Sequence, residues 1–254
     1  MISRSIEIAT PGGILDAYVA HPRDGAPAPL VVLMMDIWGL REGLFGLARR
    51  IAQNGYYCIL PNLYHRDGRI SYPTHDADGN PRVFETLPGA EREEMRARAA
   101  RLDRTMIGFD MAAVFEFCRG EPVGGAAAGV VGFCMGGRFA FFAAQACPDR
   151  IRATASLHGT HLVTPASDSV HRMCGSLKGE VYCGFGEHDP LSPPDVVGAL
   201  DQSFSAVAGL RAQIRVHTGA GHGYAVPDRD RYCEAAAERD WDDIFAMLKR
   251  QLAA

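Results

Sequence analysis

The sequence lacks a long apolar run, a basic stripe and a paired cysteine motif, and each absence excludes a class of protein. No apolar stretch approaches the about 20 residues that a helix needs to span a bilayer, so we expect no membrane span. The formal net charge is −4, and no cluster of lysines and arginines suggests nucleic-acid binding. The first residues lack the apolar core of a secretory signal, so none is expected.

Seven cysteines are present, and no two of them form a C-x-x-C pair. Reduced thiols in a cytoplasmic protein are the simplest account of an odd, scattered set. An odd cysteine count in a reducing cell does not indicate a covalent dimer, and the oligomeric state stays open.

The order of the expected elements predicts the fold class. Hydrophobic residues make up 47% of the 254 residues and charged residues 22%, which is typical of a globular protein with a sizeable core. Short β-prone runs alternate with helical patterns, which predicts an α/β protein with a mostly parallel sheet and helices on both faces. Residues 4–8 and 14–20 predict an antiparallel hairpin at one edge. No repeat or domain boundary is visible, so we expect a single domain over residues 1–254.

Other segments have clear patterns too. The remaining expected strands include 30–35, 57–60, 153–157, 180–185 and 213–216, and the expected helices include 40–53, 91–102, 107–118, 194–207 and 235–252. Phe109 is expected to face the core, and residues 124–128 are expected to form a small-residue loop. Residues 61–90 are rich in Pro, Gly, Asp and Asn and show no period, as in a functional loop or lid. We expect 61–104 to be a lid or insert segment.

A nucleophile-elbow pattern occupies residues 130–137, which read Val-Val-Gly-Phe-Cys-Met-Gly-Gly. It predicts a strand, a tight turn and a helix, with Cys134 in the place usually held by serine. The helix N-terminus would favour a thiolate at Cys134. A buried core cysteine after a strand would produce the same short motif, so an acid and a base elsewhere in the chain must decide between the two.

The chain supplies both partners after later strands. Asp189 follows the strand 180–185, and His222 lies between two glycines after the last strand. Nucleophile, acid and base therefore follow the chain order of the α/β-hydrolase fold. In this interpretation His222 transfers protons and Asp189 orients it. Asp189 as a simple turn residue and Glu187 as the acid remain alternatives.

His158 and His161 suggest a metal pair, but no acidic or cysteine ligand stands at a supporting spacing. We therefore expect no metal, and we expect these histidines to line the site or cap the loop after strand 153–157.

Several motifs together resemble one family. They are Met35-Asp36-Ile37-Trp38-Gly39-Leu40, Gly55-Tyr56, Leu60-Pro61-Asn62-Leu63-Tyr64, Gly132-Phe133-Cys134-Met135-Gly136-Gly137, Glu187-His188-Asp189-Pro190 and Gly221-His222-Gly223-Tyr224. Over nearly the whole chain they resemble the dienelactone hydrolases, cysteine-nucleophile members of the α/β-hydrolase fold. The resemblance implies that fold and a triad of Cys134, His222 and Asp189. It also implies an oxyanion hole made by the backbone N–H groups of Ile37 and Met135, and no cofactor.

The chain departs from the family pattern at two positions. Asp36 stands where the family usually has a glutamate that helps to activate the cysteine. Val226 stands where the best-known members have an arginine that holds a substrate carboxylate. A second family arginine aligns with Arg92. Four other arginines are expected to be solvated surface charges, namely Arg66, Arg69, Arg229 and Arg231.

The resulting hypothesis is a hydrolase that cleaves a small ester or lactone through an acyl-enzyme on Cys134. Asp36 is interpreted as a further catalytic carboxylate, with capping of the helix near Leu40 or a turn role as the alternative. The candidate substrate-binding residues are Arg92, Trp38, His158 and Tyr224. A cysteine-dependent thioesterase or acyltransferase on the same fold is the alternative activity, and a non-catalytic binding protein is a further alternative.

Overall fold

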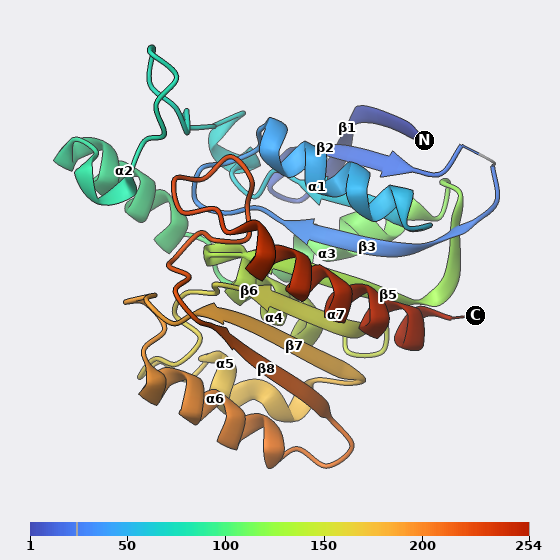
Figure 1. Cartoon of the computed structure of the whole chain (residues 1–254). Helices are drawn as coiled ribbons and strands as arrows, with labels where there is room; N and C mark the ends of the chain where they lie inside the picture. Colours follow the sequence, from blue (N-terminus) through green and yellow to red (C-terminus); the bar gives the residue numbers. More distant parts are fainter. Residues whose placement is uncertain (24, 254) are drawn as a thin grey trace.

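A single eight-stranded sheet forms the centre of the computed structural model, which describes residues 1–23 and 25–253 (Figure 1). The strands are β1 (Ile2–Thr10), β2 (Gly13–His21), β3 (Ala28–Met34), β4 (Tyr57–Pro61), β5 (Val123–Phe133), β6 (Ile151–Leu157), β7 (Glu180–Gly186) and β8 (Arg211–His217). Their spatial order is β1-β2-β4-β3-β5-β6-β7-β8. The pairs β1–β2 and β2–β4 are antiparallel. The pairs β4–β3, β3–β5, β5–β6, β6–β7 and β7–β8 are parallel. The expected parallel sheet with an edge hairpin is confirmed.

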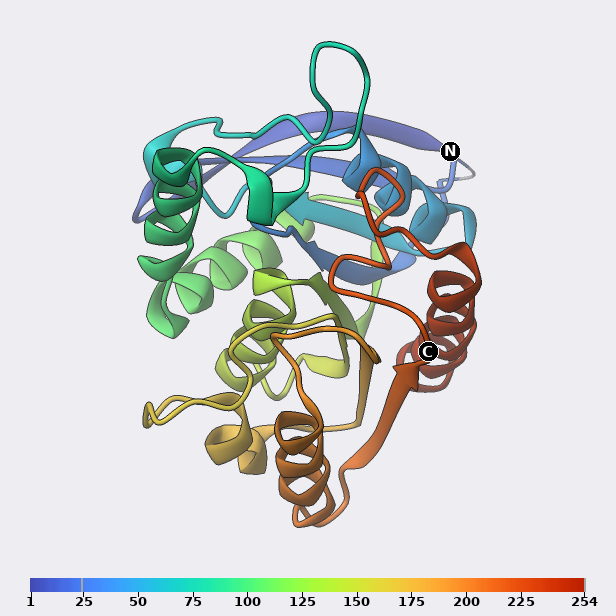
Figure 2. The ribbon, with the colours of Figure 1, turned by 60° about the vertical axis from the view of Figure 1, so that its left-hand side comes forward.

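Helices cover both faces of this sheet (Figures 1 and 2). On one face, α1 (Glu42–Gln53) packs on β2 and β4, and α7 (Glu234–Leu252) packs on β5, β6 and β7. The other face carries α3 (Arg104–Cys118), α4 (Met135–Ala146) and α6 (Pro194–Ser205), with the short α5 (Val170–Met173) between α4 and α6. The remaining short helices are η1 (His65–Asp67), η2 (Phe84–Thr86), α2 (Gly89–Ala100) and η3 (Cys174–Ser176).

Burial follows the position of each strand in the sheet. The central strands β3, β4, β6 and β7 are buried along almost their whole length, as their continuous apolar runs predict for strands covered on both faces. The edge strand β8 is largely exposed. On α7, Trp241, Ile244 and Leu248 are buried on the side that packs on the sheet. Helices of the described residues are too short or too polar to cross a membrane.

Two expectations about packing are wrong. Phe109 is 52% exposed, because α3 buries the stripe of Ile107, Met111, Val114 and Cys118, which lies on the other side of the helix. Residues 124–128 are not a loop before β5 but belong to it. They include a bulge, where the pairing with β3 shifts from Gly124 to residue 128.

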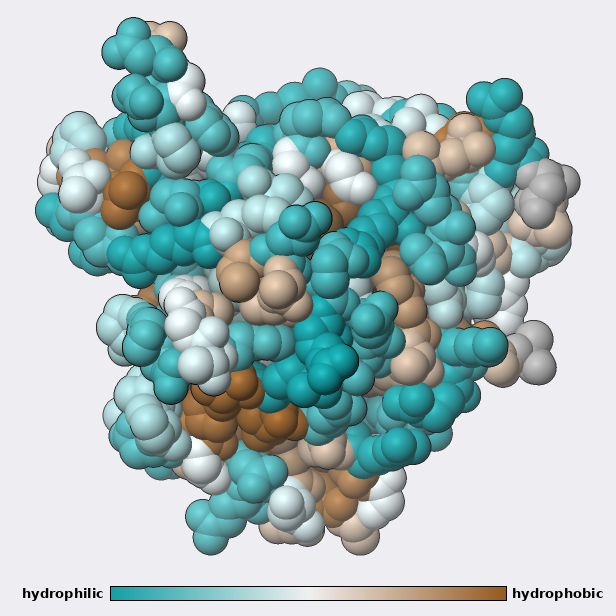
Figure 3. Space-filling model, in the orientation of Figure 1, coloured by the Kyte–Doolittle hydropathy of each residue, from teal (hydrophilic) through white to brown (hydrophobic). Residues whose placement is uncertain are grey.

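Residues 61–90 are largely irregular, as expected, and part of this segment projects from the body of the protein (Figure 2). A bridge between His75 and Pro81 closes a narrow loop that projects from the molecule and has a hydrophilic surface (Figure 3). The following helix α2 buries only Met95 and Ala99. A second bridge joins Ser71 to Gly39, next to the end of β3. The segment therefore begins beside the sheet edge that carries the predicted site.

The candidate site residues follow the carboxyl ends of neighbouring strands. Asp36 follows β3, Cys134 follows β5 and His158 follows β6. Asp189 and His222 come from the loops after β7 and β8. In the sheet, β4 lies on one side of β3 and β5 lies on the other side, so the strand order changes direction at β3. Such a switch point is where open α/β sheets place ligand sites.

Candidate active site

Cys134 occupies the sharp turn between β5 and α4. Its φ of 56° and ψ of −121° are strained for a residue with a side chain. The neighbouring backbone over-determines this conformation, because the Cys134 N–H donates to the Leu157 carbonyl at 3.1 Å and its carbonyl accepts from the Thr160 N–H at 3.1 Å. A Cβ on Gly132 would overlap the carbonyl of Gly136. The absence of a side chain at Gly132 therefore permits the close backbone approach at this turn.

His222 lies between Cys134 and Asp189. Its Nε2 atom is 3.2 Å from the Cys134 sulfur, and its Nδ1 atom is 2.8 Å from Oδ2 of Asp189. The other oxygen of Asp189 accepts the Leu191 N–H at 2.9 Å, so this carboxylate also stabilises its own turn. Glu187 instead accepts the Gly219 N–H and is half exposed. The acid beside His222 is therefore Asp189.

The surroundings of His222 favour its protonated form. Burial opposes the charge, but the interaction with the Cys134 sulfur and the hydrogen bond to Asp189 outweigh it and raise the pKa of His222 to about 10. With Nδ1 facing a carboxylate, Nε2 carries the proton that faces the sulfur. The arrangement can therefore hold a thiolate–imidazolium pair, the reactive form of a nucleophilic cysteine.

The Tyr64 hydroxyl lies between Ile37 and Met135. It donates to the Ile37 carbonyl at 3.0 Å and lies 3.4 Å from the sulfur of Met135. A Cβ on Gly136 would overlap the carbonyl of Met35, so the end of β3 packs directly on the elbow. Within residues 1–23 and 25–253, the N–H groups of Ile37 and Met135 donate no hydrogen bond to another protein group. Both are free to bind an oxygen atom.

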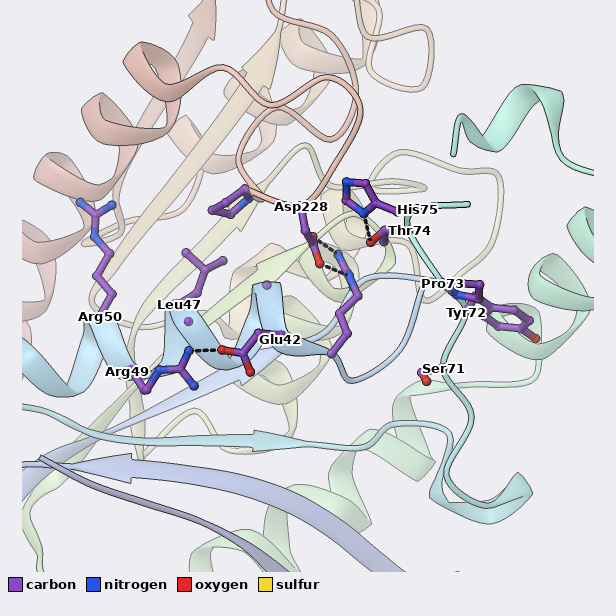
Figure 4. A pocket seen from close by; sticks show the side chains of 14 residues that line it. Glu42, Leu47, Arg49, Arg50, Ser71, Tyr72, Pro73, Thr74, His75 and Asp228 are labelled. Carbon is purple, nitrogen blue, oxygen red and sulfur yellow. Dashed lines mark hydrogen bonds and ion pairs between the residues drawn. The ribbon is translucent and has the colours of Figure 1, made fainter. Parts of the chain in front are cut away.

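Asp36 is buried and ion-paired. Arg41 donates to Oδ1 at 2.6 Å and to Oδ2 at 2.8 Å, and the Trp38 N–H donates to Oδ1 at 3.0 Å. The same guanidinium binds Asp228, in the loop after His222 (Figure 4). In this arrangement the carboxylate of Asp36 faces a cation and stabilises the turn that presents Ile37.

One open pocket lies away from the triad. It has a volume of about 830 Å³ and is lined by α1, by residues 71–75 and by Pro227 and Asp228 (Figure 4). Its arginines already have acidic partners, since Arg49 binds Glu42 and Arg50 binds Glu238. Size alone therefore does not identify the site, and we place it at the triad because the reactive groups converge there.

The expected substrate-binding residues occupy different places. Trp38 is fully buried, and its backbone N–H donates to Asp36. His158 lies against His222, and Tyr224 lies against His158. Arg92 is on α2, where it donates to the Glu85 carbonyl at 2.9 Å and lines a surface pocket formed by that helix. His158 and Tyr224 are thus gathered beside the triad, whereas Trp38 lies at the Asp36 turn and Arg92 on α2.

Arg229 is a residue whose position the sequence did not indicate. Its side chain is only 8% exposed, its guanidinium lies over the Trp38 ring at 4.3 Å, and it binds Asp230. The expectation of a solvated charge is therefore wrong, because the loop after His222 folds back over Trp38. The run Asp-Arg-Asp-Arg at 228–231 resembles an exposed charged turn and carries no signal of this burial. By contrast, Arg69 is exposed as expected.

Among the described residues, no cluster of three or more His, Cys, Asp or Glu side chains is arranged to hold a metal ion. All seven cysteines are free thiols.

The chain is similar to known proteins over nearly its whole length. The family model described as "Dienelactone hydrolase family" matches residues 15–252. A carboxymethylenebutenolidase of Rhodococcus opacus is 25% identical over 248 residues, which cover 96% of this chain and 89% of that protein. A protein of Methylorubrum extorquens, provisionally named carboxymethylenebutenolidase, is 26% identical over 246 residues, which cover 95% of this chain and 78% of that protein.

A similar fold occurs in solved structures. A provisionally named dienelactone hydrolase from Klebsiella pneumoniae has a TM-score of 0.78 at 24% identity, covering 96% of this chain and 98% of that one. A dienelactone hydrolase from Anabaena variabilis has a TM-score of 0.67 at 14% identity, covering 99% of this chain and 98% of that one. With the match over residues 15–252, the chain therefore belongs to the dienelactone hydrolase family and is a carboxylic ester or lactone hydrolase.

Proposed function

We propose that this hydrolase cleaves a small ester or lactone through a covalent thioester on Cys134. The observation that carries the proposal is the alignment of three side chains, with His222 3.2 Å from the Cys134 sulfur and 2.8 Å from Asp189. Nucleophile, base and orienting acid at hydrogen-bond distance are the geometry that nucleophilic catalysis requires.

The reaction proceeds in two steps. The Cys134 thiolate attacks the carbonyl carbon, a C–S bond forms, and the C–O bond to the alcohol breaks as His222 gives the leaving oxygen its proton. Water then attacks the thioester while His222 takes one of its protons, which releases the carboxylic acid and restores the thiolate. Asp189 keeps Nδ1 of His222 bonded throughout, so that the same nitrogen donates and accepts the proton.

The N–H groups of Ile37 and Met135 are proposed to bind the oxyanion in both steps. Their lack of protein acceptors and their place on either side of the elbow support this role. A backbone donor of this kind lowers the barrier by about 3 kcal/mol, because it meets the charge only as the charge develops.

Asp36 is proposed to take part from an ion-paired resting state. Arg41 balances its charge, so that the nearby carboxylate does not oppose a thiolate at Cys134. To accept a proton, Asp36 must first leave Arg41. Its turn-stabilising bond to the Trp38 N–H fits the alternative of a structural role, and the comparison of variants given in the Discussion distinguishes the two.

Substrate recognition remains a proposal at the level of a small molecule. His158 and Tyr224 lie beside the triad and Trp38 lies at the Asp36 turn, but all three are buried and would act on a substrate through their neighbours. Arg92 lies on α2, within the proposed lid, residues 61–104. A cytoplasmic location also stays a prediction, and the free cysteines agree with a reducing compartment.

A substrate panel tests the proposed activity. Small esters, lactones and acyl-thioesters are compared, each with and without a carboxylate and with and without a competing thiol or amine acceptor. Hydrolysis of esters or lactones with an acyl group trapped on Cys134 supports the proposal. Preferred transfer to the added acceptor, or turnover of thioesters alone, would instead indicate the acyltransferase or thioesterase.

A further inference from the structure

His158 lies beside His222, yet the mechanism above gives it no chemical step. It follows β6, and its backbone N–H donates to the Gly184 carbonyl of β7 at 2.8 Å. Its φ is +40°, a conformation that favours glycine. Non-glycine residues persist there when the surrounding structure holds them, and they cluster at functional sites. The fold thus keeps a strained histidine directly next to the triad.

The imidazole of His158 is enclosed by aromatic rings. It is 1% exposed, and within the described chain both ring nitrogens lack a hydrogen-bond partner. The ring centres of Phe133, His222 and Tyr224 lie 5.9, 5.0 and 5.5 Å away. A buried polar group without a partner is costly, whereas a hydrocarbon ring of similar size has no such cost. Because the ring is covered, it can act on a substrate only through a neighbour.

His158 and His222 differ in charge. Burial, and then the positive charges of His222 and Arg229, hold the pKa of His158 well below its usual range, so this ring is neutral. The charged or titratable groups around the pair are Cys134 and Asp189 on the side of His222, and Arg229, Arg41 and Tyr224 on the side of His158. The two rings meet edge to face at 74°, an arrangement that is attractive for aromatic rings.

The ring of Tyr224 packs against the ring of His158 and is itself held in place. Its hydroxyl donates to Asp240, a fully buried carboxylate on α7. Asp240 also accepts from the Tyr182 hydroxyl at 2.6 Å and binds Nε2 of His217 at 2.5 Å. Tyr224 therefore cannot withdraw without breaking a buried polar cluster, and His158 is wedged between a fixed ring and the ring of His222.

A single hydrogen bond to Asp189 leaves the imidazole of His222 free to rotate about the line of that bond. Contact with a second, fixed ring at 74° removes this freedom. We propose that His158 is a positioning residue, which holds the ring plane of His222 so that Nε2 stays directed at the Cys134 sulfur. The inference rests on the proposed role of His222, and the buried cluster at Asp240 is its anchor.

The test compares His158→Ala with His158→Phe. Both replacements have a Cβ, so the backbone strain at φ +40° is similar, and only Phe restores a ring. The control is His21→Ala, which also removes a buried histidine stacked on an aromatic ring, Tyr57, but in β2, away from the triad. Thermal unfolding establishes that each variant is folded. The measurements are kcat, KM and the rate of Cys134 alkylation between pH 6 and 10.

We expect His158→Ala to lower kcat about 10- to 100-fold with little change in KM, because a displacement of about 1 Å costs about 100-fold. The alkylation rate should fall in parallel and lose its parental pH profile. Phe should recover most of both losses, and His21→Ala should match the parent. If His158→Ala does not fold, Tyr224→Phe keeps the ring but removes its anchor on Asp240, and should lower kcat a few-fold.

The proposal is overturned if folded His158→Ala keeps the parental kcat and alkylation profile, or if Phe recovers nothing. Parental kcat in Tyr224→Phe would also contradict it. His222→Ala separates this inference from the proposed function. If His222→Ala keeps full activity, the proposed triad is wrong. If His222→Ala loses activity while His158→Ala keeps it, only the positioning role of His158 is wrong.

Discussion

Arg41 donates two hydrogen bonds to Asp36, and the same guanidinium donates two more to Asp228. Its remaining N–H binds the Gly39 carbonyl at 3.1 Å, so all five donors are used. One buried cation thus joins the turn after β3, which presents Ile37, to the loop that follows His222. The two loops that supply the proposed oxyanion donor and the proposed base are held to each other through this ion pair.

Removal of this cation should destabilise the fold. Arg41→Met leaves the carboxylate of Asp36 buried without a counter-ion, and we expect the free energy of unfolding to fall by about 3–5 kcal/mol. Arg49→Met, on α1, breaks a pair with the exposed Glu42 and should lower this free energy by no more than about 1 kcal/mol. Urea unfolding measures both. If the free energy of unfolding falls equally in the two variants, the buried pair of Arg41 and Asp36 contributes no more to stability than the exposed pair of Arg49 and Glu42.

Replacement of Asp36 separates its two possible roles. Asn keeps the shape and most of the hydrogen bonds but cannot accept a proton, whereas Glu restores the carboxylate of the family pattern. If the carboxylate takes part in catalysis, we expect Asp36→Asn to lose at least about 100-fold in kcat and Asp36→Glu to stay active. The measurement is kcat between pH 6 and 9. Full activity of Asn with only a change in stability would make Asp36 structural.

Activity should persist to unusually high pH. The pKa of His222 is raised from 6.5 to about 10, so His222 keeps the proton that it gives to the leaving group until the pH passes about 10. This pKa belongs to the free enzyme, so we expect kcat/KM to fall above that pH. The free energy of unfolding should depend on pH in the same direction. The stabilisation that comes from protonated His222 is fully present below pH 6.5 and disappears as the pH rises to about 10. Loss of activity already at pH 7 to 8, through deprotonation of His222, would contradict this assignment.

The elbow should not tolerate a methyl group. A Cβ on Gly136 would overlap the carbonyls of Met34 and Met35. Neither backbone carbonyl can move without displacing the turn after β3, which carries Ile37. We expect Gly136→Ala to be unfolded or inactive. Gly198 on α6 has open space around it, and Gly198→Ala should stabilise the protein by about 0.5–1 kcal/mol. Thermal unfolding of the two variants, with activity of the folded one, checks both outcomes.

The parts of the site that could be predicted from the sequence are those that local motifs carry. Glycines around Cys134 mark a crowded turn, and the chain order of Cys134, Asp189 and His222 points to strand ends that a parallel sheet brings together. The structure places these three side chains in line, although their catalytic roles remain proposals. The strand pattern likewise indicated the sheet and its edge hairpin.

What could not be predicted depends on contacts between distant segments. Arg41 and Asp228 are 187 positions apart, so nothing near either residue announces their pairing. Arg229 has the sequence context of a surface turn, and only the folding of its loop onto Trp38 buries it. Phe109 shows the opposite error, because helical spacing alone does not reveal which side of α3 meets the sheet.

Loss of the base should be severe in this account. Because the members of a triad act as a unit, His222→Ala is expected to lower kcat at least about 1,000-fold while the protein remains folded. Cys134→Ser should also fold but be strongly impaired, since a hydroxyl is a weaker nucleophile than the thiolate that this site favours. Steady-state kinetics on the best substrate of the panel measures both. A serine variant with parental turnover would remove thiolate formation from the mechanism.

Titration of Cys134 with iodoacetamide, followed by peptide mass spectrometry and activity measured in the same samples, tests the central claim most directly. Among the seven thiols, Cys58 and Cys183 are fully buried, and burial raises the pKa of each, so neither should react at neutral pH. The account predicts that Cys134 is the only thiol to react fast and that activity falls one-for-one with its modification. Activity that survives complete modification of Cys134 would contradict it.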